Sequence, residues 1–221
     1  MTPSPKRPEN SNTTNNRLDS KSNHKNAPST AYLFWKRFFD IFFSFLLILL
    51  LALPMLLITV WIRIDSKGPA IFRQIRHGKN GALFTIYKFR TMRIETPSEC
   101  ASNSLRNPED YITRVGRFLR RTSIDELPQL FNILRGEMSF VGYRPVCTTE
   151  TLLNTLRQEN GVFSMRPGLT GLAQIHGRDL VTCHEKANLD LQYKEKCSLR
   201  TDLYCLYRTV CIVLSGEGIL Q

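Results

Sequence analysis

The sequence lacks any cysteine pattern that would join two thiols or hold a metal. Its 221 residues include six cysteines, but no Cys-x-x-Cys pair and no cysteine–histidine spacing typical of a zinc site. A chain of this length buries enough apolar surface to fold without disulfides. We therefore expect free thiols in a reducing compartment, which favours the cytoplasm for the main folded part.

Acidic residues are few relative to basic ones. Lysine and arginine total 30 against 19 aspartates and glutamates, so the formal net charge is +11. Such a surplus indicates a polyanionic partner, which could be nucleic acid, anionic lipid headgroups or a phosphorylated substrate. The sequence carries no helix-turn-helix, RRM or KH signature, and we therefore expect no nucleic acid as a partner.

Large apolar side chains are scarce in residues 1–31, which are rich in Asn, Ser, Thr, Pro and Lys. Such a segment cannot bury enough surface to offset the entropy of ordering, so we predict a disordered polar tail. No apolar run follows its basic residues closely enough to make a signal peptide.

Charged residues are absent from residues 41–62. As a helix this run would be about 33 Å long, close to the thickness of the hydrocarbon core of a membrane. Trp35 and Trp61, near its two ends, suit the membrane–water interface. We therefore predict a membrane helix over residues 32–65.

The sequence allows two arrangements of that helix in the membrane. Pro54 lies inside the run, where it removes a helical hydrogen bond and favours a bend. Basic residues lie on both flanks, among them Lys36 and Arg37 before the run and Arg63 after it. The positive-inside tendency draws both flanks to the cytoplasm. A straight span and a bent helix that re-enters one leaflet both stay open at this point.

The remaining residues, 66–221, predict an α+β domain of mostly short helices. Aromatic and β-branched residues at 70–74 and 83–89 flank turn chemistry at 77–81, which predicts a β-hairpin with a basic face. Residues 95–110 are typical of a surface loop. Helical spacing of apolar residues at 202–214 predicts a helix that either faces the core or lies on the membrane surface.

Asp125 and Glu126 form the centre of the densest polar block, which begins with Arg120 and Arg121. Pro128 suits the first turn of a helix, so Asp125 is expected at or near the N-cap, where it should stay ionised. An ordinary helix cap would explain Asp125 by itself. The neighbouring arginines favour chemistry with phosphate, in which a carboxylate can attack phosphorus or hold Mg²⁺.

Two further segments each place an Arg-Pro step in a glycine-containing turn. These steps are Arg144-Pro145 and Arg166-Pro167. Proline restricts the backbone there and glycine permits close approach of a ligand. Taken with the carboxylate pair, the two turns suggest several arginines that converge on phosphates.

Taken together, these segments resemble the bacterial sugar transferase family, whose members are monotopic phosphoglycosyl transferases acting on polyprenyl phosphate. The resemblance covers about residues 33–210. It rests on long motifs in the family's order: Lys36-Arg37-x-x-Asp40, Gln74-x-Arg76-x-Gly78, Tyr87-Lys88-Phe89-Arg90-Thr91-Met92, Asp-Glu-Leu-Pro-Gln-Leu-Phe-Asn from Asp125, Gly-Glu-Met-Ser-Phe-Val-Gly-x-Arg-Pro from Gly136, and Arg-Pro-Gly-Leu-Thr-Gly from Arg166.

The resemblance implies a ping-pong reaction. Asp125 would attack the β-phosphate of a UDP-sugar, UMP would leave, and undecaprenyl phosphate would take the sugar phosphate from the aspartyl intermediate. Glu126 would assist in proton transfer or metal placement, and Mg²⁺ would bind at Asp125. Basic residues matching family positions near the phosphates are Lys88, Arg120, Arg144 and Arg166.

The resemblance also implies the membrane arrangement. The family's membrane element is a re-entrant helix bent at a proline, which Pro54 matches, with Lys36, Arg37 and Asp40 at its root. The expected location is the bacterial inner membrane, with residues 66–221 forming a catalytic domain on the cytoplasmic face. Membrane lipids are then a third class of partner beside the UDP-sugar and the polyprenyl phosphate.

Three positions depart from the family pattern. Tyr143 replaces the first proline of the usual Gly-Pro-Arg-Pro, so that turn is either looser or brings Tyr143 to the substrate. Leu53 replaces the serine that often precedes the membrane proline, which weakens the expected bend. His77 stands where proline is common in the hairpin turn, and is expected to be a turn residue. His176 is expected to be structural, with a place in the sugar or nucleotide pocket as the alternative.

An inactive, family-like membrane scaffold of a polysaccharide assembly complex is the main competing hypothesis. Both carboxylates are intact, which disfavours it. A nucleotide-sugar glycosyltransferase of the ordinary kind would need an Asp-x-Asp motif, which this sequence lacks. The sugar itself is not encoded in any transferable motif, and we expect it to be selected by loops near 95–110 and 175–186.

Overall fold

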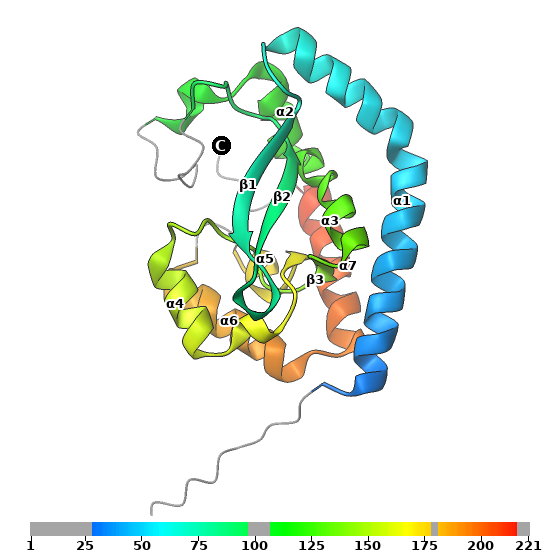
Figure 1. The fold of residues 1–221 in the computed structure, drawn as a ribbon, viewed down its shortest axis with the longest axis vertical. Coiled ribbons are helices and arrows are strands. Elements are labelled where there is room, and N and C mark those ends of the chain that lie inside the picture. The colour runs from blue at the N-terminus through cyan, green and yellow to red at the C-terminus, as the bar shows by residue number, and fades with distance from the viewer. Residues whose placement is uncertain (1–27, 97–106, 178–180, 216–221) are drawn as a thin grey trace, which may run out of the picture.

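In the computed structural model, which describes residues 28–96, 107–177 and 181–215, one long helix curves along a domain of shorter helices and two small sheets (Figure 1). The expected α+β class is confirmed. The polar tail up to residue 27, most of the 95–110 loop and residues 178–180 lie outside the described residues. Within the predicted loop at 95–110, the described residues Pro108–Tyr111 form a 3₁₀ helix.

The long helix is α1, Thr30–Asp65, and it continues through Pro54 as a single element. It is long and apolar enough to cross a membrane. One stripe packs on the domain: Ile62 is buried, and residues such as Leu47, Leu51 and Ile58 are partly buried against two core clusters. Most of its other large apolar side chains are exposed, so the rest of the surface of α1 is suited to lipid.

The predicted hairpin is present as β1, Ile71–His77, and β2, Leu83–Phe89, which pair antiparallel. Asn80 takes a left-handed conformation in the connecting turn, which is favourable for Asn and Gly. Side chains alternate along a strand, so Arg76 and Lys88 share one face of the hairpin, while Arg73 lies on the other.

A second sheet was not anticipated, because its strands have only three residues each. Strands β3, Ser139–Val141, and β4, Gly168–Thr170, pair in parallel. The pairing continues as a bridge between Tyr143 and Pro167. The two Arg-Pro turns therefore lie side by side, and a Cβ on Gly142 would stand 2.4 Å from the Arg166 carbonyl oxygen.

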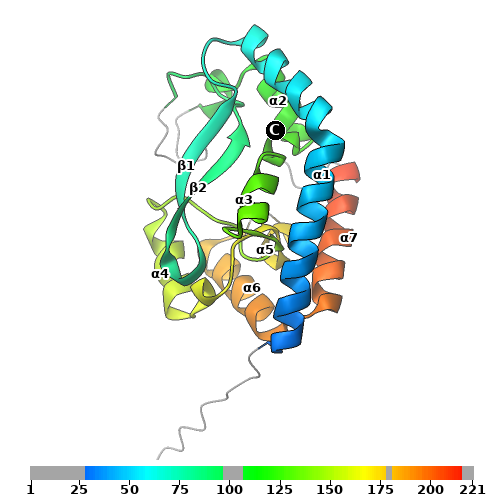
Figure 2. The ribbon, with the colours of Figure 1, turned by 45° about the vertical axis from the view of Figure 1, so that its right-hand side comes forward.

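The remaining elements are helical. They are α2, Arg114–Arg121, α3, Gln129–Arg135, α4, Thr151–Glu159, α5, Leu172–Ile175, α6, Cys183–Lys196, and α7, Leu199–Ser215, with one-turn 3₁₀ helices at Lys79–Gly81, Ile124–Glu126 and Val162–Ser164. Helix α3 lies between α1 and the hairpin. Helices α4 and α6 lie at the end of the domain where α1 begins (Figures 1 and 2).

Helix α7 runs beside α1 in both views (Figures 1 and 2). It buries Asp202, Cys205 and Ile212 but leaves most of its other apolar residues at the surface. These exposed residues are Leu199, Leu203, Tyr204, Leu206, Tyr207, Val210 and Leu214. The stripe of α7 with Cys205 and Ile212 packs into the core, as the core-facing prediction requires, and contact of the exposed residues with a membrane stays a prediction.

Candidate active site

Asp125 and Glu126 lie in the 3₁₀ turn Ile124–Glu126 between α2 and α3. Ser123 begins this turn in a left-handed conformation, which reverses the chain after α2. The expectation that Asp125 caps the following helix is wrong, because α3 begins at Gln129 with Pro128 as its N-cap. Proline restricts φ and needs no N–H partner at a helix start, so the cap moves three residues along the chain.

Glu126 gathers two cations. Lys88 Nζ and Arg144 Nη2 each lie 2.9 Å from Glu126 Oε1. The Lys88 and Glu126 side chains are mostly covered, at 19% and 16% exposure, whereas Arg144 is 45% exposed and open to solvent. A carboxylate shared by two cations holds both in place.

Asn132 explains why Lys88 reaches this point. Its Oδ1 accepts from Tyr87 N at 3.1 Å, and its Nδ2 donates to the Thr85 carbonyl at 2.7 Å. These bonds join α3 to β2 one residue from Lys88. Asn132 is fully buried, and the sequence pattern assigned no role to this link between α3 and β2.

Arg120 enters the site from the last turn of α2. Its Nε donates to Thr91 Oγ1 at 2.9 Å, just beyond the end of β2. Helix α2 can approach this strand because Gly116 lies directly against Thr91, whose carbonyl oxygen would be 2.0 Å from a Cβ at that position. Arg120 is therefore held between two elements, with its charge acting on Asp125.

The two carboxylates differ in their acidity. Burial raises the pKa of Asp125 to about 6, and Glu126 adds to the rise, while Lys88, Arg120 and Arg144 oppose it. Burial would also raise the pKa of Glu126, but Arg144 and Lys88 outweigh it and bring that pKa below its ordinary value. At neutral pH Glu126 is a fixed anion, while Asp125 is a mostly ionised carboxylate of unusual basicity.

Arg166 does not join this cluster. Its Nε donates to the Gly136 carbonyl at 2.9 Å, just after the C-terminal end of α3, whereas Asp125 precedes the start of that helix. Arg37 of α1 binds the same end, donating to the carbonyls of Ile133 at 2.7 Å and Leu134 at 3.0 Å. The structure thus brings Lys88, Arg120 and Arg144 to the carboxylate pair. Arg166 instead binds a backbone carbonyl at the C-terminal end of α3.

The root of α1 is bonded to the domain. Besides Arg37, Lys36 Nζ lies 2.8 Å from Asp202 Oδ2 of α7. Asp40 accepts from Ser139 Oγ at 3.1 Å and from Phe140 N at 3.0 Å. The three charged residues expected to anchor the chain at the membrane therefore fix α1 to β3, α3 and α7.

The donor set at the carboxylate pair permits a divalent cation under one condition. Lys88 and Arg144 already pair with the charge of Glu126 at Oε1, which makes Asp125 the carboxylate whose charge is less compensated and better able to attract a metal. Within residues 28–96, 107–177 and 181–215, no group of three or more metal-ligating side chains is present. A Mg²⁺ ion would therefore be held here by one carboxylate together with water and substrate phosphates.

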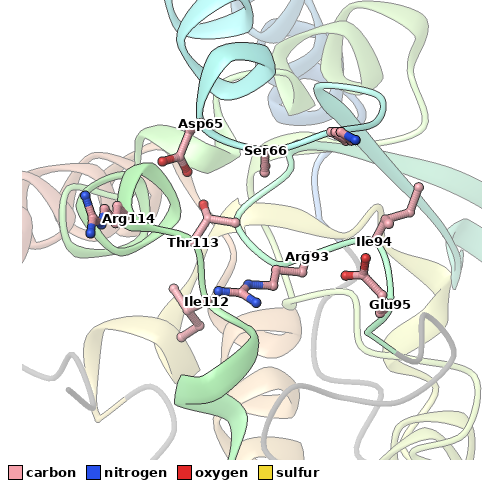
Figure 3. Close-up of a pocket in the computed structure, with 9 residues that line it drawn as sticks. Asp65, Ser66, Arg93, Ile94, Glu95, Ile112, Thr113 and Arg114 are labelled. Atoms are coloured by element: carbon pink, nitrogen blue, oxygen red, sulfur yellow. The ribbon is translucent and has the colours of Figure 1, made fainter.

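A separate cavity of about 470 Å³ lies at the far end of α1 (Figure 3). Figure 3 shows Asp65 and Ser66 at one side and Arg93, Glu95 and Thr113 around it. The cavity is lined by none of the four residues whose charges act on Asp125, which are Lys88, Arg120, Glu126 and Arg144. The cavity lies between residues 65–67, 93–95 and 112–114 rather than at the carboxylate pair.

Comparison with known proteins gives one consistent result. The family model for bacterial sugar transferases matches residues 31–216. The chain is 39% identical over 186 residues to the uncharacterized sugar transferase EpsL of Bacillus subtilis, covering 84% of this chain and 90% of that protein. It is 40% identical over 198 residues to a UDP-glucose:undecaprenyl-phosphate glucose-1-phosphate transferase of Caulobacter vibrioides, covering 86% and 74%.

A third relative is longer. The chain is 39% identical over 202 residues to an undecaprenyl-phosphate galactose phosphotransferase of Salmonella typhimurium, and the match covers 84% of this chain but 41% of that protein. The chain therefore corresponds to nearly all of some relatives and to less than half of others.

Proposed function

We propose that this chain, which belongs to the bacterial sugar transferase family, transfers a sugar 1-phosphate from a UDP-sugar to undecaprenyl phosphate. The observation that carries the proposal is the ionisable Asp125 beside Glu126, within reach of the charges of Lys88, Arg120 and Arg144. A nucleophile enclosed by phosphate-binding cations suits attack on a diphosphate. The relatives named for this reaction support the choice of donor and acceptor.

In this proposal Asp125 is the nucleophile. One carboxylate oxygen forms a bond to the β-phosphorus of the UDP-sugar as the bond from that phosphorus to the bridging oxygen breaks, and UMP leaves with the electron pair. A phosphate oxygen of undecaprenyl phosphate then attacks the same phosphorus and returns the carboxylate. The raised pKa of Asp125 supports this role, because a more basic carboxylate is a better nucleophile while it stays ionised at neutral pH.

Glu126 acts by holding Lys88 and Arg144 beside the reacting phosphates. Its lowered pKa argues against proton transfer, since a carboxylate that stays ionised delivers no proton at neutral pH. Arg144 is the most exposed of the cations and is the one best placed to meet incoming phosphate oxygens. We propose Mg²⁺ as the cofactor, held by Asp125 and the substrate phosphates. When bound, it would neutralise charge on the leaving UMP.

We place the domain on the cytoplasmic face of the inner membrane, with α1 re-entering one leaflet. Both ends of α1 are bonded to the same domain: Arg37 binds α3, and Arg90 of the segment after β2 donates to the Ser66 carbonyl at 2.7 Å. Two ends fixed to one folded unit favour one side of the bilayer for both. The exposed apolar face of α7 beside α1 supports contact with the same leaflet.

The sugar is selected outside the carboxylate cluster in this proposal. The relatives are named for glucose and for galactose, which differ in the orientation of one hydroxyl. The segments near 95–110 and 175–186 remain our candidates, and parts of both lie outside the described residues. His176 is exposed, and its Nδ1 pairs with the Leu172 carbonyl of its own helix, which fits the structural role.

The experiment is UMP release by the purified full chain with Mg²⁺, undecaprenyl phosphate and, in separate reactions, UDP-glucose and UDP-galactose. We expect turnover with a UDP-sugar and its loss in Asp125→Asn, which keeps the size of the side chain but removes the nucleophile. Full turnover in Asp125→Asn would overturn the assignment. Release of no UMP from a panel of UDP-sugars would favour the inactive scaffold.

A further inference from the structure

The turn that presents Arg144 to Glu126 differs from the family pattern at Tyr143, where proline is usual. We propose that Tyr143 is a positioning residue that ties this turn to the tip of the β1–β2 hairpin and thereby fixes Arg144 at the carboxylate pair. The inference rests on the proposed function, because Arg144 matters to it as a phosphate-binding group. It concerns this chain in particular, since a proline could form none of the contacts described below.

The hydroxyl of Tyr143 supplies the first contact. It donates to the carbonyl of His77, the last residue of β1, at 3.2 Å. His77 is itself a departure from the family pattern, so two unusual positions meet in the fold. Burial raises the pKa of Tyr143 far above its ordinary value, so the hydroxyl keeps its proton and remains a donor.

The ring of Tyr143 supplies the second contact. The guanidinium of Arg157 lies 5.1 Å from the ring centroid, within the range of a cation–π interaction. The same Arg157 donates from Nη1 to the Arg144 carbonyl at 2.9 Å. Arg157 cannot move readily, because it forms a buried ion pair with Asp190 at 2.6 Å, and both side chains are 1% exposed.

Phe163 completes the arrangement. Its ring centroid lies 5.5 Å from that of Tyr143 and 5.5 Å from that of His77, so it packs against both members of the hydrogen bond. Phe163 belongs to the one-turn helix Val162–Ser164 and is buried. Phe163 thus covers the bond that joins the Arg144 turn to the hairpin.

These contacts explain how the turn dispenses with proline. Proline restricts the backbone through its own ring, whereas tyrosine leaves φ free and must be fixed from outside. Tyr143 is 1% exposed, which rules out the alternative that it contacts substrate. The hairpin is therefore connected to Glu126 twice. Lys88 of β2 forms an ion pair with Glu126, and His77 binds Tyr143, whose neighbour Arg144 forms the second ion pair.

The test compares two hydrogen-bonded tyrosine hydroxyls by Tyr143→Phe and Tyr32→Phe. Tyr32 is the control, since its hydroxyl donates to Asp202 Oδ2 at 2.9 Å and joins α1 to α7 rather than to the Arg144 turn. We expect Tyr143→Phe to lower kcat/KM about five-fold, equivalent to the ~1 kcal/mol of one hydrogen bond. We expect Tyr32→Phe to lower Tm with no such loss of kcat/KM.

A double-mutant cycle with Arg144 gives a readout that a purely structural role would not move. In an Arg144→Ala background, Tyr143→Phe should cause no further loss of kcat/KM, because its effect passes through Arg144. Tyr32→Phe should leave kcat/KM unchanged in either background.

Each contrary outcome identifies what has failed. A wild-type chain without UMP release from any UDP-sugar overturns the proposed function, and this inference with it. An active wild type with an unchanged kcat/KM in Tyr143→Phe overturns the positioning role alone, as does an equal loss in the Arg144→Ala background. If Tyr143→Phe does not fold, Phe163→Leu carries the same test, because it removes the ring that encloses the bond.

Discussion

Asp125 must satisfy two opposed conditions, since it has to be ionised to attack phosphorus while its burial favours the protonated form. With a pKa raised to about 6, it is ionised above that pH and protonated below it. We predict that kcat/KM falls about tenfold per pH unit below pH 6. A limb near the ordinary value of 3.8 in the wild type would contradict the site electrostatics.

The raised pKa of Asp125 also means that its ionised form destabilises the folded chain. Its folded-state pKa exceeds the ordinary value of 3.8, so between these values the folded chain binds more protons than the unfolded one. Stability attributable to this group therefore falls as pH rises from about 4 to about 6, and the cost is complete above that range. Asp125→Asn should raise the free energy of unfolding by on the order of 1 kcal/mol at pH 7.5, with the gain vanishing near pH 4. Lower Tm of the variant at pH 7.5 would oppose the prediction.

At the scale of elements, the site depends on the joint between α3 and β2. Asn132 fills that joint with bonds to Tyr87, Thr85 and Glu137. Asn132→Ala leaves buried backbone groups unpaired, so we predict a loss of about 2–3 kcal/mol in unfolding free energy. Activity of the folded fraction should also fall, because Lys88 is then less well held. Denaturant titration measures the first effect. Asn154→Ala is a control on the distant α4, where the amide bonds only the Cys147 carbonyl and is expected to cost less.

How far the sequence predicts this site depends on the range of each contact. The hairpin and the carboxylate pair could be predicted, because turn residues and motif letters are local signals. The helix cap at Asp125 was predicted wrongly, since a competing local choice, Pro128 as the cap, lay three residues away. Sheet β3–β4 and the role of Arg166 at Gly136 depend on residues about 30 positions apart, for which sequence spacing carries no signal.

For the whole molecule, the central geometric feature is that α1 is bonded to the domain at both ends. Single cysteines at Ser29 and Lys67, in a chain whose native cysteines are replaced by serine, should therefore react from the same side of the membrane with an impermeant thiol reagent. Oriented vesicles of each sidedness provide the measurement, and a cysteine replacing Arg200 on the domain is the control for the cytoplasmic side. Reaction of positions 29 and 67 from opposite sides would show a spanning helix.

The most direct test of the account is to trap the phosphosugar on Asp125. The chain is incubated without lipid acceptor, with Mg²⁺ and a UDP-sugar that it turns over, labelled in the β-phosphate. The account predicts that the label appears on the peptide containing Asp125, that it passes to undecaprenyl phosphate when the lipid is added, and that Asp125→Asn shows none. Turnover of the UDP-sugar with an unlabelled protein, or with the label on another residue, would contradict it.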